Sequence, residues 1–164
     1  LNGLSPKQNR EVPPLDYGRV RRLKTRRPDL QIIINGGVLT AEQALALCRD
    51  VDGVMIGRAA YQNPFMLIET EEALFGRATV SGDRHDVVAR MLPYIDTAAA
   101  RGVPLHAVTR HMLGLFQGQP GARAWRRHLS ENSCRAGANS ETVQRALELV
   151  RHAETSLRSR DRAA

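Results

Sequence analysis

The sequence has few cysteines, few aromatic residues and no long apolar run. Its two cysteines, Cys48 and Cys134, are too few and too far apart for a disulfide framework or a zinc site. No run approaches the roughly 18 apolar residues of a membrane span, and no signal peptide opens the sequence. Hydrophobic residues still make up 42% of the 164 residues, which is enough for a core. We therefore expect a protein of a reducing, cytoplasmic compartment, without a metal and without a membrane partner.

Acidic residues are missing from a long stretch of the second half. The formal net charge is +7, and no acidic residue occurs between Asp96 and Glu131. The same stretch contains these arginines and histidines: Arg101, Arg110, Arg123, Arg126, Arg127, His106, His111 and His128. A region that keeps cations and omits anions is what a polyanion-binding face requires. A solvated, arginine-rich face explains the same charge equally well, so charge alone leaves both interpretations open.

Strand and helix signals alternate over the first part of the chain, and only helix signals follow. The predicted strands are residues 30–34 and 51–56, and the predicted helices are residues 16–27, 41–49 and 64–75. A strand, a helix and a strand with short loops form a βαβ unit, whose helix starts at a Thr40–Gln43 capping box. Residues 78–86 are typical of a linker. Helices are then predicted at 84–100, 104–116, 121–132 and 140–158, so the chain divides near residue 80 into an α/β part and a small helical bundle.

Two glycine-containing loops follow the predicted strands. Asn35, Gly36 and Gly37 come after the first strand, and Gly57 and Arg58 come after the second. Ligands of parallel α/β folds gather at the carboxyl ends of strands, where glycines let backbone N–H groups approach an anion. Tight strand-to-helix turns are the alternative explanation for a glycine pair. The occurrence of two such loops on successive strands favours a phosphate site, to which Arg58 adds a positive charge.

Four separated motifs resemble the C-terminal half of bacterial tRNA-dihydrouridine synthases of the A subfamily. They are GLSPKQNREVPPLDY, INGGV, DGVMIGRAAYQNP and GLFQGQPGARAWRRHLSENS, and the resemblance runs through essentially the whole chain. It implies the C-terminal part of an FMN-dependent TIM (β/α)8 barrel over residues 1–80 and a helical tRNA-binding domain over residues 84–164. It also implies that NADPH reduces the flavin, which reduces uridines 20 and 20a of the tRNA D-loop, in an enzyme that is monomeric at full length.

The resemblance assigns residues of this chain to two sites. The implied flavin contacts are Asn35, Gly36, Gly37, Gly57 and Arg58. The implied tRNA contacts are Lys7, Arg10, Arg123 and Arg126. Lys7 and Arg10 lie on a proline-stiffened loop that precedes the first predicted helix.

The resemblance also implies that catalytic parts are missing. A TIM barrel needs roughly 250 residues and eight strands, whereas two strands and the loop after a third are visible in this sequence. The family's catalytic cysteine lies in the absent N-terminal half, together with a flavin-contacting lysine and histidine. Cys48 is expected in mid-helix as a small buried hydrophobe. Cys134 is an equally poor candidate for the catalytic cysteine. We therefore expect no catalytic residue in this chain and no activity from it alone.

Two other classes of function stay open. One is a non-catalytic tRNA-binding remnant. The other is a phosphate-binding TIM barrel that acts on a free metabolite, although the acid-free arginine stretch in a separate helical part argues against it.

Overall fold

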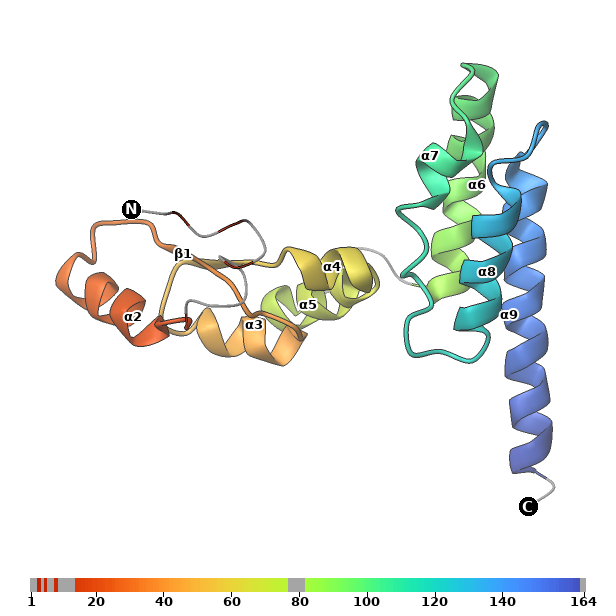
Figure 1. Ribbon diagram of the computed structural model, residues 1–164. Helices are drawn as coiled ribbons and strands as arrows, with labels where there is room; N and C mark the ends of the chain where they lie inside the picture. Colours follow the sequence, from red (N-terminus) through yellow and green to blue (C-terminus); the bar gives the residue numbers. More distant parts are fainter. Residues whose placement is uncertain (1–2, 4, 6–7, 9–13, 77–81, 163–164) are drawn as a thin grey trace. The chain divides into compact units, whose positions relative to one another are not determined.

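The chain forms two compact units, Leu1–Gly57 and Arg58–Ala164. The computed structural model describes residues 3, 5, 8, 14–76 and 82–162 (Figure 1). Among the helices in these residues, not one combines the length and the apolar character that crossing a bilayer requires.

The first unit contains the predicted strand–helix–strand arrangement. Its elements are α2 (Tyr17–Arg26), β1 (Ile33–Asn35), α3 (Ala41–Leu47) and β2 (Gly53–Met55). β1 and β2 are parallel, and their register pairs Ile33 with Gly53 and Asn35 with Met55. Both strands are shorter than the apolar runs that predicted them, because within the described residues each strand has a single neighbour to pair with. The arrangement is a βαβ unit, as the sequence predicted.

Local capping explains where the helices of this unit begin. Asp16 accepts a hydrogen bond from the Arg19 backbone N–H (2.8 Å) and thereby caps α2. Thr40 caps α3 by accepting from the Gln43 N–H (3.2 Å), which confirms the first half of the predicted capping box. The reciprocal bond differs from that motif, because the Gln43 side chain accepts from Leu39 N (2.8 Å) rather than from Thr40. The core beneath these elements is Ile34, Val38, Ala44, Leu47 and Val51.

Within the described residues, the secondary-structure elements of the second unit are all helices. Its helices are α4 (Arg58–Gln62), α5 (Met66–Phe75), α6 (Arg84–Ala100), α7 (Leu105–Thr109), α8 (Ala122–Asn132) and α9 (Ser140–Asp161). Helices α6, α8 and α9 match predicted helices closely, and α9 continues to Asp161. The short helix α4, which begins at Arg58, was not predicted.

The prediction of one helix over residues 104–116 is wrong, because α7 ends at Thr109. Turns follow it, and the Met112 carbonyl accepts both the Leu115 backbone N–H (3.0 Å) and the Trp125 indole N–H (3.0 Å). Gly114 lies directly against the Gln62 carbonyl, where a Cβ would clash. These contacts come from residues far away in sequence, so the local helix signal could not reveal them.

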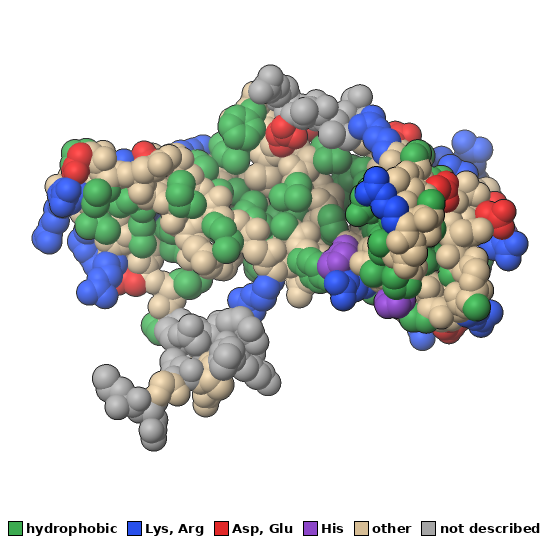
Figure 2. Space-filling model, turned by 90° about the horizontal axis from the view of Figure 1, so that it is seen from above, with side chains coloured by type: hydrophobic (Ala, Val, Ile, Leu, Met, Phe, Trp, Pro, Cys, Tyr) green, Lys and Arg blue, Asp and Glu red, His purple; other side chains and the backbone are tan. Residues whose placement is uncertain are grey.

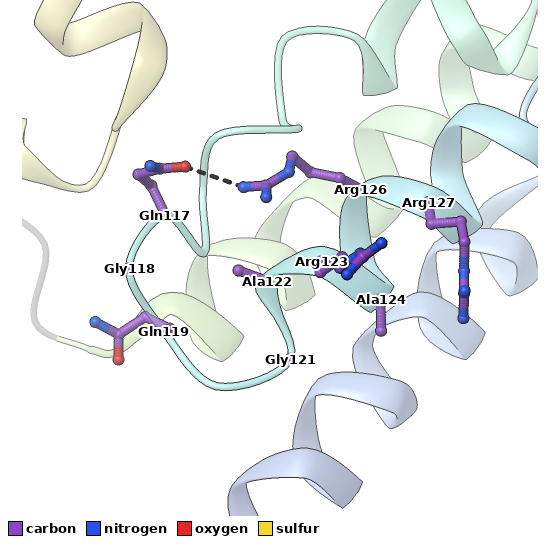
Figure 3. A pocket seen from close by; sticks show the side chains of 9 residues that line it. All are labelled: Gln117, Gly118, Gln119, Gly121, Ala122, Arg123, Ala124, Arg126 and Arg127. Atoms are coloured by element: carbon purple, nitrogen blue, oxygen red, sulfur yellow. Dashed lines mark hydrogen bonds between the residues drawn. The ribbon is translucent and has the colours of Figure 1, made fainter.

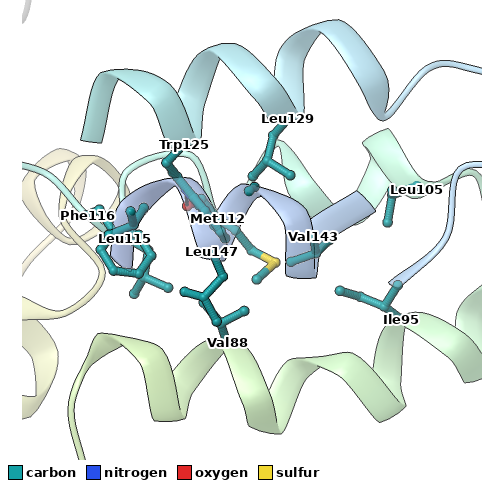
Figure 4. Packing of buried hydrophobic residues seen from close by; sticks show 12 residues of the cluster. Val88, Ile95, Leu105, Met112, Leu115, Phe116, Trp125, Leu129, Val143 and Leu147 are labelled. Carbon is teal, nitrogen blue, oxygen red and sulfur yellow. Dashed lines mark hydrogen bonds between the residues drawn. The ribbon is translucent and has the colours of Figure 1, made fainter. Parts of the chain in front are cut away.

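Four helices, α6 to α9, enclose one apolar core (Figure 4). Trp125 is completely buried in it. The Trp125 and Phe116 rings meet edge to face with centroids 5.0 Å apart. Residues from all four helices complete the core, among them Val88, Ile95, Leu105, Leu129, Val143 and Leu147.

The segment between α4 and α5 packs against these helices through Arg84. Arg84 Nη1 donates to the Leu115 carbonyl (2.6 Å) and to Asn63 Oδ1 (3.2 Å). The Arg84 guanidinium group lies 4.1 Å from the centre of the Phe65 ring. Burial lowers the pKa of Arg84 from its ordinary value. Residues 58–76 therefore group with α6 to α9, whereas the sequence placed the boundary between domains near residue 80. Mostly helical structure with one parallel strand pair, as the described part of the chain shows, is consistent with part of a barrel.

Candidate functional site

The loop after β1 requires glycine for reasons of its own conformation. Gly36 and Gly37 have φ values of 109° and 66°, a region that favours glycine. A Cβ on Gly36 would lie 2.7 Å from Leu15 Cδ2, and one on Gly37 would lie 2.9 Å from the Tyr17 hydroxyl. That hydroxyl also donates a hydrogen bond to the Gly36 carbonyl. Turn geometry and packing thus account for both glycines, and their predicted contact with a flavin stays a prediction.

Gly57 differs, because neither conformation nor packing requires a glycine there. Its φ is not positive, and the nearest atom to an added Cβ would be Met55 Sδ at 3.7 Å, an ordinary contact. Since Asn35 pairs with Met55, the loops that follow the two strands leave the sheet at the same edge. Gly57 thus leaves backbone exposed at that edge, as close approach of a ligand requires. Arg58 follows as the first residue of α4, and its side chain is exposed.

Four of the seven Lys and Arg side chains in residues 14–57 are paired with carboxylates, whereas Arg19, Arg26 and Arg49 form no salt bridge there. Salt bridges join Arg21 to Asp50 (2.6 Å), Arg22 to Asp16 (3.9 Å), Lys24 to Asp52 (2.7 Å) and Arg27 to Asp29 (2.6 Å). The hydrogen bond from Arg27 holds the pKa of Asp29 below its ordinary value, and the bond from Lys24 has the same effect on Asp52. The positive charges of these residues are therefore partly neutralised within the fold.

The arginines of α8 lack such partners. Within the described residues, no carboxylate forms a salt bridge with Arg123, Arg126 or Arg127. All three side chains are exposed, whereas Trp125 and Leu129 of the same helix are buried. On the face of the molecule shown in Figure 2, Lys and Arg side chains are spread over the surface, with histidines among them on the helical unit. Unpaired guanidinium groups on a solvent-facing side of a helix are available to an anionic partner.

The α8 arginines line an open cavity of about 500 Å³ (Figure 3). Its lining is Gln117, Gly118, Gln119, Gly121, Ala122, Arg123, Ala124, Arg126 and Arg127. Gln117 Oε1 accepts a hydrogen bond from Arg126 Nη1 (3.0 Å), so one of the guanidinium groups has a fixed orientation. Gly121, with a φ of 80°, turns the chain into α8, where no side chain caps the helix. We call this cavity the α8 pocket.

Comparison with known proteins identifies the family of the chain. The sequence pattern of the dihydrouridine synthase family (Dus) matches residues 2–151. The chain belongs to this family. The resemblance seen in the sequence motifs is thereby confirmed.

Its relatives are enzymes named tRNA-dihydrouridine(20/20a) synthase. The chain is 50% identical over 154 residues to the one from Vibrio cholerae, covering 94% of this chain and 47% of the relative. It is 53% identical over 150 residues to the one from Shewanella oneidensis, covering 92% of this chain and 45% of the relative. With the Escherichia coli K12 protein the identity is 52% over 150 residues, covering 92% and 44%. The chain thus spans about half the length of the curated relatives it matches.

The structure brings some of the predicted site residues together. Arg123 and Arg126, which the resemblance assigned to tRNA, line one cavity, because three residues make about one helical turn. Arg127 and Gln117 line it too, although the sequence-based assignment omitted both. Arg127 could have been found, because it lies four residues after Arg123 and so on the same face. Gln117 lies in a turn, and only the fold shows that it contacts Arg126.

Other predicted residues lie elsewhere. Lys7 and Arg10 are outside the described residues. Cys48 is not in mid-helix as predicted: it follows the last residue of α3 and is half-buried, because the helix ends at Leu47. Cys134 is exposed. Within the described part of the chain, no three His, Cys, Asp or Glu side chains gather as a metal site would require.

Proposed function

We propose that this chain is part of a flavin-dependent reductase that converts uridine to 5,6-dihydrouridine in the D-loop of tRNA. The observation that carries the proposal is the set of unpaired arginines on α8, in a chain whose relatives are named for acting on tRNA. Positions 20 and 20a are the target uridines that the names of those relatives indicate. A barrel enzyme for a free metabolite would have no use for an arginine-lined cavity in a helical unit separate from its strands.

The α8 pocket is proposed to bind the RNA backbone. Arg123, Arg126 and Arg127 can each donate charge-assisted hydrogen bonds to phosphate oxygens. Such contacts position the RNA without reading its sequence. Lys7 and Arg10 are proposed to supply a second set of contacts. Two separated sets of backbone contacts would hold a folded RNA in one orientation and so determine which nucleotide reaches the flavin.

The strand-end loops are proposed to hold the phosphate of FMN. Gly57 leaves its backbone accessible, and Arg58 offers a guanidinium group directly after it. Asn35, Gly36 and Gly37 leave the same edge of the sheet and are proposed to contact the flavin from the neighbouring strand. When bound, FMN supplies the hydride chemistry, with NADPH as the proposed reductant. The residues of this chain contribute binding and orientation.

The flavin assignment is tested by the Arg58→Ala substitution in the complete protein expressed from its gene. Removing a charge-assisted hydrogen bond is expected to cost about 1.5–3 kcal/mol of FMN affinity. Flavin fluorescence on serial dilution measures the dissociation constant. An Arg58→Ala protein that keeps its flavin as tightly as the unaltered protein would contradict the assignment.

The RNA assignment is tested by Arg123→Ala combined with Arg126→Ala. For each arginine that no longer neutralises a phosphate, the log–log slope of tRNA affinity against salt should fall by roughly 0.7–0.9. Affinity measured at two salt concentrations gives this slope, and FMN content should stay unchanged. Equal affinity and slope in both proteins would show that these arginines are only a solvated face.

The 164 residues alone are expected to form no dihydrouridine, and product from them would refute the view that the chain holds no catalytic residue.

A further inference from the structure

A second polar cavity lies where α8 ends and α9 begins. Its volume is about 250 Å³, and its lining is His128, Asn132, Arg135, Ala136, Gly137, Ala138, Asn139, Glu141, Thr142 and Arg145. Two arginines from different elements meet in it: Arg135 comes from the connection between the helices, and Arg145 comes from the second turn of α9. We call this cavity the α8–α9 cleft.

The connection that carries Arg135 is held in place by its own hydrogen bonds. Ser133, at its start, is 3% exposed and accepts from the Thr109 hydroxyl (3.0 Å). Gly137 has a φ of 76°, and the Ala138 N–H donates to the Arg135 carbonyl (3.2 Å). A backbone fixed in this way limits the entropy that binding would remove, because only the arginine side chain remains to be ordered.

The charge of the cleft favours an anion. Within the described residues, no carboxylate forms a salt bridge with Arg135 or Arg145. Glu141 is the only acidic residue in the lining, and its backbone N–H is bound to the Asn139 side chain (3.0 Å). His128 and Asn132 add polar groups from α8. The lining contains two guanidinium groups and one carboxylate, so its net charge is positive.

We infer that the α8–α9 cleft is a second binding site for tRNA backbone phosphate, with Arg135 and Arg145 as its contacts. The inference rests on the proposed function. The first half of α8 lines the α8 pocket, whereas His128 and Asn132 of its second half line the cleft, and the 11 residues of the helix span about 16 Å at 1.5 Å per residue. One strand of a nucleic acid duplex places about five phosphates along such a length, at roughly 3.4 Å of helix axis each. One RNA backbone can therefore reach both cavities.

The inference is tested on the full 164-residue chain with unmodified tRNA transcript as the probe. In the test variant, Arg135→Ala is combined with Arg145→Ala. In the matched control, Arg151→Ala is combined with Arg158→Ala, which removes the same charge from α9. Arg151 and Arg158 are exposed and line neither the α8 pocket nor the α8–α9 cleft. We expect tRNA affinity to fall roughly tenfold and the salt slope to fall by about 1.4–1.8 in the test variant, because two arginines no longer neutralise phosphates. The control should change affinity less than about twofold.

The comparison of the test variant with the control separates a phosphate site from a general effect of charge. Equal reductions of affinity in the test variant and the control would mean that only the overall charge of the chain attracts RNA, and the inference would fall. An unchanged test variant would also overturn it. Arg135→Lys combined with Arg145→Lys keeps both charges, and it should keep the salt slope while losing part of the affinity, because lysine lacks the bidentate fork. An unchanged unfolding temperature in all variants shows that they are folded.

The Arg123→Ala, Arg126→Ala variant belongs in the same assay. If it weakens binding and the Arg135→Ala, Arg145→Ala variant does not, the proposed function stands and the cleft is not a phosphate site. If neither weakens binding, the proposed function fails with the inference.

Discussion

A single hydrogen bond fixes one of the arginines that are proposed to contact RNA. Gln117 accepts from Arg126 at 3.0 Å and so holds the guanidinium at the edge of the α8 pocket. Gln117→Ala removes this bond and leaves Arg126 to be ordered when RNA binds. We expect tRNA affinity to fall about two- to tenfold, which corresponds to the roughly 0.5–1.5 kcal/mol of a neutral-acceptor hydrogen bond. Filter binding or fluorescence anisotropy measures the change.

Gln119 provides the matched control, because it lines the same cavity and no hydrogen bond joins it to Arg126. Gln119→Ala should leave the affinity within about twofold of the unaltered value. Equal effects of the two substitutions would show that Gln117 acts only as part of the cavity wall.

Two glycines of the first unit are expected to respond differently to alanine. Gly36→Ala forces a side chain into a φ of 109° and towards Leu15, so we expect it to destabilise the first unit by about 1–3 kcal/mol. Gly57→Ala meets only an ordinary contact with Met55, so the fold should be kept and FMN affinity in the encoded protein should fall. Chemical denaturation and flavin titration separate the two effects. A Gly57→Ala protein with unchanged FMN affinity would leave this glycine without a role.

At the scale of elements, Asp52 joins the start of β2 to the segment that enters β1. Its carboxylate accepts from Lys24 Nζ (2.9 Å) and from the Ile32 backbone N–H (2.8 Å). These bonds lower the pKa of Asp52 below its value in the unfolded chain. The stabilisation is therefore fully present above the unfolded pKa and is lost as the pH falls through the lower, folded pKa. We expect the first unit to unfold more readily in acid, below about pH 4.

Asp52→Asn provides the test, because it removes the titrating group. Urea unfolding of both proteins at neutral and at acidic pH should show a difference in midpoint that shrinks in acid. A difference that stays constant with pH would exclude Asp52 as the source of the pH dependence.

The sequence predicted those elements whose signals are local. Thr40 caps the helix that was expected to begin after it, Asp16 caps α2 although the predicted helix already included it, and Asp83 caps α6 through a complete capping box with Asp86. The end of α7 was missed because it depends on contacts with Gln62 and Trp125, which are distant in sequence.

The sites follow the same division between local and distant signals. Arg123 and Arg126 could be paired from their spacing, and the glycine loops could be found because each follows an apolar run. Arg135 and Arg145 are ten residues apart on different elements, so no periodicity connects them. Their common cavity becomes visible only when the connection between α8 and α9 is folded.

On the scale of the whole molecule, the two units differ in how much apolar structure stabilises them. The first has five buried residues in its core, whereas the core of the second has twelve. The two strands of the first unit also have unpaired edges within the described residues. A two-stranded parallel sheet with a small core is marginal in water. The units are therefore expected to differ in stability.

Hydrogen exchange measured by mass spectrometry on the 164-residue chain tests this expectation. Amides of α6, α8 and α9 should be protected far longer than those of β1, α3 and β2, because they open only when the larger core unfolds. Trp125→Ala, which empties the centre of that core, should cost about 3–5 kcal/mol and shorten protection in the helices. Exchange in β1 and β2 should stay the same, because Trp125 contributes nothing to their core. Equal protection in both units of the unaltered chain, or reduced protection in both after Trp125→Ala, would show that the chain unfolds as one cooperative body.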